Sequence, residues 1–571
     1  MRKVSLVIIG AGPAGLAAAA EARRRGVPDV LVLERNDRVG GILNQCIHDG
    51  FGVERFSEAL TGPEYVARFR REACAPGVEI LCSAMVTAIT PERRVTFVAR
   101  GGQQTVQAGA VLLATGCRER TRGAIGVAGT RPAGVYTAGV VQHLVNLQNR
   151  SVGRRAVILG SGDIGLIMAR RLTLEGVEVV EVLEKLPYCS GLQRNVRQCL
   201  QDFNIPLRLS TTVTELRGRA HLTGVVASAV DASGSPVPGS EREIACDALI
   251  LSVGLIPENE LARACGVRMD PVTGGALVDG ALMTSVPGVF ACGNCLHVHD
   301  LVDFVSAEAE YAAASAAAYL RGAAYAGPQL PVTAGEGVRY VLPRSVVPGR
   351  AATLSLRVKE PGGAGRVCAR TEAGAELAAR RLARLSPAEM IRLPLKTGAD
   401  APLTVALEQR QAAAQPAQEG GLVCTVCPNG CALTVRPDGA GGWSVEGARC
   451  QRGREFAVAE MTAPVRTLTT SIPVTGGVRP MVSLRSCEPL PRAQLRAAVR
   501  RLNGLCLAAP VALGQRVELG GIWFAATDDV PQKAAGGPPR SGSGAPEPVK
   551  KGNPAGRERR VGDIRQGGPE Q

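Results

Sequence analysis

The sequence predicts an α/β protein with two Rossmann-like three-layer domains, followed by a small all-β domain and a small cysteine-rich α+β domain. Three observations support this fold class. A glycine-rich turn joins an apolar strand to an alanine-rich helix near residue 10, the pattern recurs 150 residues later, and four cysteines cluster between residues 424 and 450. Strands that alternate with helices in this way form parallel sheets that helices cover on both faces.

Length and charge restrict the classes of function. A chain of 571 residues corresponds to about three to five domains. The formal net charge is +15, but all except seven of the 66 basic residues are arginine, and they form no basic stripe. Aromatic residues make up only 3% of the chain, which leaves few surfaces for stacking bases. We therefore expect no nucleic-acid partner.

Membrane insertion and secretion are not expected. No apolar run reaches the ~18–20 residues of a membrane span. The first nine residues resemble the start of a signal peptide, but Gly10, Gly12 and Gly15 follow at once, so we interpret them as a buried strand. Seventeen cysteines, an odd number without framework spacing, favour a reducing compartment. The expected location is the cytoplasm.

The first nucleotide motif begins with an apolar strand at Val4–Ile9 and continues through Gly10, Gly12 and Gly15 into a helix at Leu16–Arg25. In such a motif the first glycine forms the tight turn, the second lets the backbone approach a pyrophosphate, and the third lets helix and strand pack closely. A second strand at 30–33 ends in Glu34, an acid placed to bind a ribose.

The same motif recurs at an offset of 150. Val157–Leu159 leads to Gly160, Gly162 and Gly165, and the strand Val177–Leu183 ends in Glu184. A single glycine motif of this kind is weak evidence in a glycine-rich chain, whereas two complete copies in register predict two dinucleotide sites. The alternative is one nucleotide site and one structural relic.

Two dinucleotide motifs and three further segments resemble the two-nucleotide flavoprotein disulfide reductase superfamily. The segments are Leu112–Gly116, Leu251–Asn259 and Gly288–Asn294, and Asn294 stands where that family usually carries aspartate. The resemblance implies an FAD-binding domain at 1–118 and 260–325, with an NAD-binding domain inserted at 119–259.

The motifs and the resemblance together assign residues to each nucleotide. The expected FAD-binding residues are Gly10, Gly12, Pro13, Ala14, Gly15, Glu34, Arg35, Gly41, Ile42, Val86, Thr115, Gly116, Gly293, Asn294, Val302 and Asp303. The expected NAD-binding residues are Gly160, Gly162, Asp163, Ile164, Gly165 and Glu184. NADH is favoured over NADPH because Glu184 would repel a 2′-phosphate and Lys185 alone is no arginine cluster.

Candidate catalytic groups lie in the segments that the resemblance places near the flavin. Cys46 has no nearby partner, so ordinary disulfide reduction is not expected, although a thiol enzyme using Cys46 or the pair Cys292 and Cys295 stays an alternative. His48, His297 and His299 are candidate proton or hydrogen-bond donors to reduced flavin, or structural histidines. A helix expected at 301–320 would point its positive N-terminus at the flavin, near Val302 and Asp303.

A narrower resemblance rests on the segments Gly40–His48 and His297–Asp303. They are similar to bacterial flavoproteins that accompany glycerol-3-phosphate dehydrogenase-type flavoenzymes. This implies an oxidoreductase that exchanges electrons between NADH and a partner redox subunit, within a possible hetero-oligomer. The alternative is a flavin-containing scaffold subunit with a zinc module, whose catalysis resides in the partner.

Residues 326–410 predict a β-sandwich-like spacer. Short strands are expected at Val338–Val347, Ala352–Val358, Ile391–Leu395 and Leu403–Leu407. A linker follows at 411–421, and a disordered tail is expected at 531–571.

The module at 420–530 carries Cys424, Cys427, Cys431 and Cys450, in the pattern C-x2-C-x3-C-x18-C. Structural zinc usually takes two separated cysteine pairs, whereas three close cysteines and one distant one favour a [4Fe–4S] cluster. Zinc and unmetallated thiols stay as alternatives. The segment resembles the iron–sulfur region of molybdopterin oxidoreductases and a cysteine-motif domain that occurs with this flavoprotein family.

Overall fold

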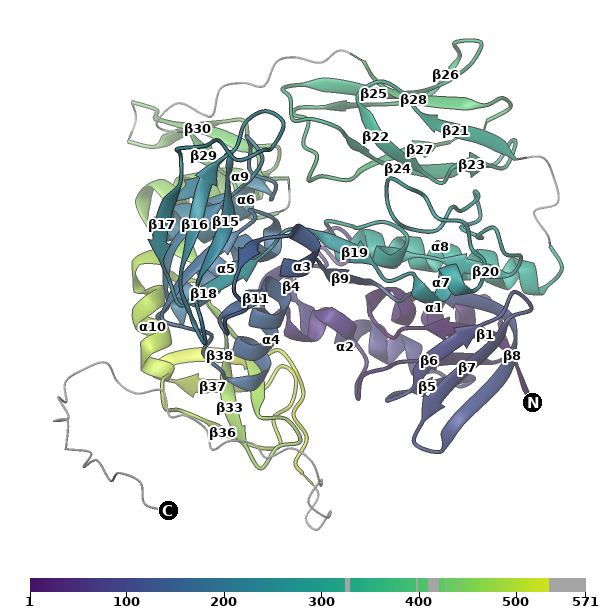
Figure 1. Ribbon diagram of the computed structural model, residues 1–571, viewed down its shortest axis with the longest axis horizontal. Helices are drawn as coiled ribbons and strands as arrows, with labels where there is room; N and C mark the ends of the chain where they lie inside the picture. Colours follow the sequence, from purple (N-terminus) through teal and green to yellow (C-terminus); the bar gives the residue numbers. More distant parts are fainter. Residues whose placement is uncertain (324–328, 397–398, 409–420, 428, 440, 534–571) are drawn as a thin grey trace, which may run out of the picture.

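The computed structural model (Figure 1) describes residues 1–571 except 324–328, 397–398, 409–420, 428, 440 and 534–571. The expected linker at 411–421, apart from Gly421, and the expected tail beyond residue 533 lie outside the described residues. Five modules follow one another: two α/β domains, a β-rich domain over α8, a cysteine module beside the second α/β domain, and a C-terminal α+β domain below it (Figure 1).

The first α/β domain is built on one large sheet. Its strand order is β5-β2-β1-β8-β7-β6, and β20 pairs with the other edge of β8. Four of these strands and β20 are parallel: β1 (Arg2–Ile9), β2 (Val30–Leu33), β5 (Val78–Leu81), β8 (Gly102–Leu113) and β20 (Val289–Ala291). The antiparallel strands are β7 (Arg94–Ala99) and β6 (Met85–Ile89). Because β2 and the second half of β1, residues 6–9, are buried on both faces, they consist of apolar residues only.

Three helices cover this sheet: α1 (Pro13–Arg24), α2 (Gly62–Ala73) and α8 (Val302–Leu320). Helices α1 and α8 are rich in alanine, so they pack closely against each other and share one core with the sheet. Helix α2 begins at a capping box in which Thr61 and Glu64 bond each other's backbone N–H groups.

The second α/β domain has a fully parallel sheet in the order β11-β18-β12-β13-β14. Its strands are β11 (Val135–Thr137), β18 (Ala248–Leu251), β12 (Arg155–Leu159), β13 (Glu178–Leu183) and β14 (Leu207–Arg208). Helices α4 (Ala138–Gln148) and α5 (Asp163–Leu174) cover one face. A second sheet covers the other face, with β10 (Ala128–Gly129), β15 (Thr211–Gly218), β16 (Leu222–Ala229) and β17 (Arg242–Ala245).

Two short strands connect the α/β domains. The chain leaves the first domain through β9 (Cys117–Glu119) and returns through β19 (Leu255–Pro257), and these strands pair antiparallel. A short helix, α7 (Glu260–Ala264), follows the return.

The third module consists of two β-sheets around their own core. One sheet contains β23 (Ser345–Val346), β21 (Leu330–Ala334), β28 (Leu403–Glu408), β25 (Gly365–Thr371) and β26 (Glu376–Leu382); the other contains β22 (Val338–Leu342), β24 (Ala352–Val358) and β27 (Ile391–Leu395). The single strand expected at 338–347 is wrong, because Pro343, which has no N–H to donate, separates β22 from β23.

The cysteine module is small. It contains β29 (Leu422–Val423), β30 (Ala432–Pro437), β31 (Trp443–Glu446) and α9 (Gln451–Thr462).

The C-terminal domain has a five-stranded sheet: β36 (Leu507–Ala508), β33 (Thr469–Thr475), β34 (Met481–Ser486), β38 (Ile522–Ala526) and β37 (Arg516–Leu519). Its helix α10 (Leu495–Leu502) packs on α5, and Leu174 of α5 belongs to its core. Arg171 of α5 also donates hydrogen bonds to Thr470 (3.1 Å) and Ser471 (3.3 Å). On the other side, Asp528 and Asp529 pair with Arg38 and Arg70 of the first domain.

The predicted fold class is therefore confirmed: two Rossmann-like domains precede small β-rich domains. All seventeen cysteines lie among the described residues, and none forms a disulfide. No described helix combines the length and apolar character needed to span a bilayer.

Candidate functional site

The three glycines of the first turn have different steric surroundings. A Cβ on Gly10 would lie 2.4 Å from the carbonyl oxygen of Ala114, and one on Gly15 would lie 1.8 Å from that of Gly10. A Cβ on Gly12 would meet nothing within 4 Å. Gly10 and Gly15 are thus required by packing, while the space beside Gly12 is open to a ligand.

The start of α1 is suited to an anion. Gly12 is its N-cap, Pro13 is its first residue, and its first turn holds no acidic side chain. The backbone N–H groups that begin a helix have no partner within the helix and carry partial positive charge. Together with the open space beside Gly12, they fit the pyrophosphate of a dinucleotide.

The second turn repeats this construction. A Cβ on Gly160 would lie 2.1 Å from the carbonyl oxygen of Ser252, and one on Gly165 would lie 2.7 Å from that of Gly160. Gly162 has more room, since its nearest neighbour, Ser252 Oγ, would be 3.5 Å away.

The acidic residues that follow the two glycine turns, Glu34 and Glu184, also make matching hydrogen bonds. The carboxylate of Glu34 accepts hydrogen bonds from the backbone N–H groups of Ala11 and Asn36, both at 2.8 Å. The carboxylate of Glu184 accepts the equivalent bonds from Ser161 (2.9 Å) and Leu186 (3.0 Å). Each acid is buried beside its glycine turn, which is where the ribose of a bound dinucleotide lies in this motif.

Two predicted NAD-binding residues have structural partners. The Asp163 carboxylate accepts hydrogen bonds from the Leu192 N–H and from Asn195 Nδ2, both at 2.8 Å, and burial raises its pKa. It therefore holds the segment around α6 (Gln193–Asn195) against α5. Ile164 packs at the edge of the second domain's core.

The other predicted FAD residues surround the first turn. Gly293 packs against Ala14, since a Cβ on Gly293 would lie 3.1 Å from that of Ala14. Gly41 contacts the backbone of Gly12, and the neighbouring Ile42 side chain is 54% exposed. An apolar side chain exposed at this position fits contact with a bound cofactor.

The remaining predicted FAD residues differ in their surroundings. Arg35 is exposed, and Val86 belongs to the core. The Thr115 hydroxyl donates to the Glu258 carbonyl (2.7 Å), and the Gly116 carbonyl accepts from the Glu258 N–H (3.0 Å). Val302 is the first residue of α8, while Asp303 accepts a hydrogen bond from the Glu54 N–H (2.9 Å).

The candidate redox thiols are buried. Burial raises the pKa of Cys46 to about 12 and raises the pKa values of Cys292 and Cys295. Since the thiolate is the reactive form, these thiols are poorly suited to nucleophilic attack at neutral pH.

His48 lies where the first domain meets the second. Burial lowers its pKa to about 4, and its buried Nδ1 atom has no hydrogen-bond partner among the described residues. The guanidinium of Arg194, on α6, reaches this segment: a Cβ on Gly50 would lie 2.9 Å from one of its nitrogens. An unpartnered imidazole nitrogen here fits a hydrogen bond to a bound cofactor.

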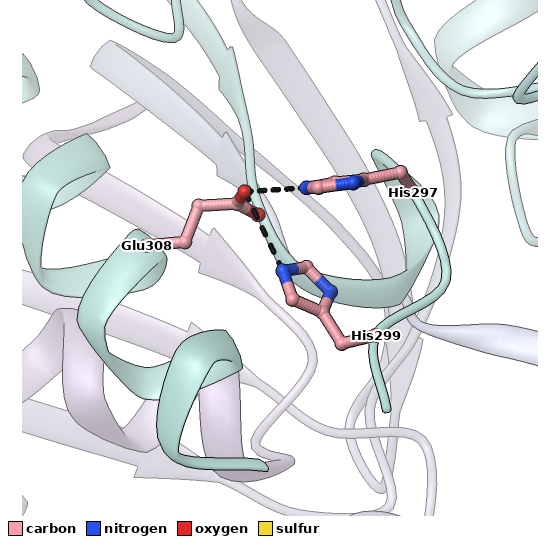
Figure 2. A group of neighbouring side chains, drawn as sticks. All are labelled: His297, His299 and Glu308. Carbon is pink, nitrogen blue, oxygen red and sulfur yellow. Dashed lines mark hydrogen bonds and ion pairs between the residues drawn. The ribbon is translucent and has the colours of Figure 1, made fainter. Parts of the chain in front are cut away.

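His297 and His299 come together around a third residue that was not predicted, Glu308 of α8 (Figure 2). His297 Nε2 lies 2.7 Å and His299 Nε2 lies 3.5 Å from Glu308 Oε2, and Glu308 Oε1 accepts the Gly293 N–H at 2.7 Å. Burial alone would raise the pKa of Glu308, but the two histidines hold it well below its ordinary value. Burial lowers the pKa of His297.

The four cysteines of the C-terminal motif are neighbours. The Cys424 N–H donates to the Cys431 carbonyl (2.9 Å), and the Cβ position of Gly453 is 3.8 Å from the sulfurs of both Cys424 and Cys450. Burial raises the pKa of Cys424, and the three other cysteines act in the same direction. Within the described part of the chain, no three of these sulfurs lie within 4.8 Å of one another.

The cysteine loop also lies against the second α/β domain. A Cβ on Gly430 would lie 3.6 Å from the backbone nitrogen of Arg194 and 3.7 Å from Gln193 Cβ. Figure 1 places β29 and β30 beside α6. Arg194 of α6 therefore lies between Gly430 of the cysteine loop and Gly50 of the first domain.

Known proteins match mainly the first half of the chain. A family model described as pyridine nucleotide-disulphide oxidoreductase matches residues 4–318, and one described as a protein of unknown function, DUF1667, matches residues 451–519. Apoptosis-inducing factor 3 of Homo sapiens is 28% identical over 301 residues, covering 51% of this chain and 45% of that protein. The chain thus spans about half the length of that relative.

Two further relatives are matched over more of their length. The putative glutamate synthase (NADPH) small chain of Cereibacter sphaeroides is 30% identical over 349 residues, covering 56% of this chain and 78% of that protein. Among solved structures, thioredoxin reductase of T. acidophilum is 25% identical with a TM-score of 0.46, covering 56% of this chain and 99% of that one.

Proposed function

The chain belongs to the pyridine nucleotide-disulphide oxidoreductase family, and we propose that it is an FAD- and NAD(P)-dependent oxidoreductase that exchanges electrons between NADH and a partner redox protein. The observation that carries this proposal is the repeated site. Two glycine turns and two buried acids share the same hydrogen bonds at an offset of 150 residues. If one of the two motifs were only a structural relic, it would not need to keep its acidic residue beside its glycine turn.

The first site is assigned to FAD, which when bound supplies the group that exchanges a hydride with NADH. The N–H groups at the start of α1 would hold its pyrophosphate, and Glu34 would bind its ribose. The start of α8 at Val302 has no side-chain cap, so its N–H groups would favour negative charge on the reduced ring. The second site is assigned to NADH rather than NADPH, because Glu184 would repel a 2′-phosphate.

The surroundings of the thiols support a route for electrons other than a disulfide. Cys46, Cys292 and Cys295 are buried with raised pKa values. The cysteine loop, in contrast, contacts the Arg194 backbone through Gly430, the Arg194 guanidinium reaches Gly50 of the first domain, and Cys450 is exposed. A redox centre in this module would therefore have one side toward the flavin domain and the other toward the surface.

An iron–sulfur cluster fits the four cysteines better than zinc. Structural zinc usually takes two separated cysteine pairs, whereas this motif has three close cysteines and one distant one. We therefore assign a [4Fe–4S] cluster to Cys424, Cys427, Cys431 and Cys450. The partner that we propose is a glycerol-3-phosphate dehydrogenase-type flavoenzyme, on the narrower resemblance of the segments at 40–48 and 297–303.

Anaerobic purification of the full chain tests the proposal. We expect bound FAD, four irons with acid-labile sulfide, and bleaching of the flavin by NADH faster than by NADPH. Failure of both nucleotides to bleach the flavin would contradict the NADH assignment. One zinc without sulfide would favour the alternative, a flavin-containing scaffold whose catalysis lies in its partner.

A further inference from the structure

The group formed by His297, His299 and Glu308 (Figure 2) joins the segment after Gly293 to α8, and His297 Nδ1 lies 3.3 Å from the hydroxyl of Tyr340 in the third module. The His297 and His299 side chains are 0% and 2% exposed. One ligand atom from each of the three residues lies within 4.8 Å of the other two. The proposed exchange between NADH and FAD assigns no task to Glu308.

The hydrogen bonds of Asn294 favour one tautomer of His299. The backbone N–H of His299 donates to Asn294 Oδ1 (3.0 Å), which identifies that atom as oxygen, an acceptor only. His299 Nδ1 lies 3.3 Å from the same oxygen, and it donates to that oxygen in the tautomer that carries the hydrogen on Nδ1. In a neutral imidazole, the lone pair is then on Nε2, which faces the Glu308 carboxylate.

Two acceptors that face each other in a buried site require positive charge between them. A proton on His299 Nε2 would form a charge-assisted bond, and such bonds are about 2.7–2.9 Å long. The observed distance to Glu308 Oε2 is 3.5 Å. This distance leaves room for a cation and is too long for a strong ion-pair hydrogen bond.

His297 has the same arrangement on its other side. Its Nδ1 lies 3.3 Å from the hydroxyl of Tyr340, on β22, and that hydroxyl can accept an Nδ1–H. Both imidazoles can therefore direct Nε2 toward Glu308 while Nδ1–H bonds an oxygen. Histidines that bind metals are commonly oriented in this way by an oxygen partner.

We propose that His297 Nε2, His299 Nε2 and the Glu308 carboxylate bind one divalent transition-metal cation. Ligand atoms at about 2.0–2.1 Å from a metal lie about 3.0–3.4 Å apart. The 3.5 Å separation of His299 Nε2 from Glu308 Oε2 is close to this range, whereas the 2.7 Å separation of His297 Nε2 from the same oxygen is that of a hydrogen bond, which the metal would replace. Two imidazoles and one carboxylate suit zinc or ferrous iron. The site is separate from the four-cysteine motif and stands independently of the NADH proposal.

Zinc-loaded full-length holoenzyme provides the test. After removal of loosely bound metal, elemental analysis should give one equivalent that is lost in His299→Ala and in Glu308→Gln. His143→Ala, which changes an exposed histidine, should retain it. X-ray absorption at the zinc edge should show imidazole and oxygen ligands in the wild type, which separates this metal from any zinc on sulfur.

The wild-type measurement decides the question even if a variant folds poorly, and the FAD content of each variant reports its folding. Zinc with sulfur ligands only, or no zinc, in the wild type would overturn the proposal.

Discussion

At the scale of single residues, each glycine turn contains some glycines that packing requires and one that leaves space for a ligand. Gly15 is closed in by the Gly10 carbonyl oxygen, whereas the position beside Gly12 is open and its φ of −71° suits any residue. The same local sequence therefore contains a position that the fold requires and a position that the cofactor requires.

Gly12→Ala and Gly15→Ala should fail in different ways. We expect Gly12→Ala to leave the stability of the FAD-free protein within about 0.5 kcal/mol but to weaken FAD retention about tenfold, or ~1.4 kcal/mol. Gly15→Ala should lower stability by about 1–3 kcal/mol or more, because its Cβ would overlap backbone. Thermal unfolding and the flavin absorbance of each purified variant measure both effects. Equal FAD retention in Gly12→Ala and wild type would contradict the assigned site.

The residues that sequence could predict are those fixed by local spacing. The glycines and the acids Glu34 and Glu184 follow a short motif, so their positions could be inferred. Glu308 could not, because it meets His297 only through the packing of α8 against the preceding loop. Tyr340 and Arg194 were missed for the same reason, since separate modules bring them to their sites.

At the scale of elements, strands with apolar residues on their buried face were predictable. The expected strands at 352–358 and 391–395 coincide with β24 and β27. Strands β25 and β26 were not predicted, because arginines interrupt their apolar pattern. Arg366 and Arg370 pair with Glu376 and Glu408 on neighbouring strands, a compensation that only the folded sheet reveals.

One buried ion-pair group connects elements of three modules. Arg466 of β32 (Val465–Arg466) contacts Asp202 of the second domain and Glu460 of α9, both at 2.7 Å. We expect Arg466→Ala to destabilise the protein by about 3–5 kcal/mol, because it leaves two buried carboxylates short of a partner. Urea unfolding followed by circular dichroism measures this. The matched change at exposed Arg516 should stay within about 0.5 kcal/mol, and equal effects of the two would refute the role of the group.

At the scale of the whole molecule, the modules meet at α6. The cysteine loop contacts Arg194 on one side of this helix, and the guanidinium reaches Gly50 of the first domain on the other. The C-terminal domain contacts both α/β domains, through Leu174 and Arg171 on one side and through Arg38 and Arg70 on the other.

This arrangement predicts that the two halves of electron transfer can be separated. Cys427→Ser should lower the iron content and abolish the electron paramagnetic resonance signal of a reduced cluster after NADH addition. Bleaching of the flavin by NADH should stay within about twofold of wild type, since the nucleotide sites are untouched; a twofold change is only ~0.4 kcal/mol. Cys487→Ser, at an exposed cysteine outside the motif, should behave as wild type. Loss of bleaching in Cys427→Ser alone would contradict the separation.

The pairing of β9 with β19 also bears on how such proteins can be recombined. Cys117 lies opposite Pro257 and Glu119 opposite Leu255, so the two ends of the inserted domain are neighbours. A domain whose ends meet can be exchanged as a cassette without altering the span that its host must bridge. In this chain the cassette would have to keep Arg171 and Leu174, because the C-terminal domain packs on them. The inserted domain can thus be replaced at its two chain junctions, but its surface around Arg171 and Leu174 must be kept.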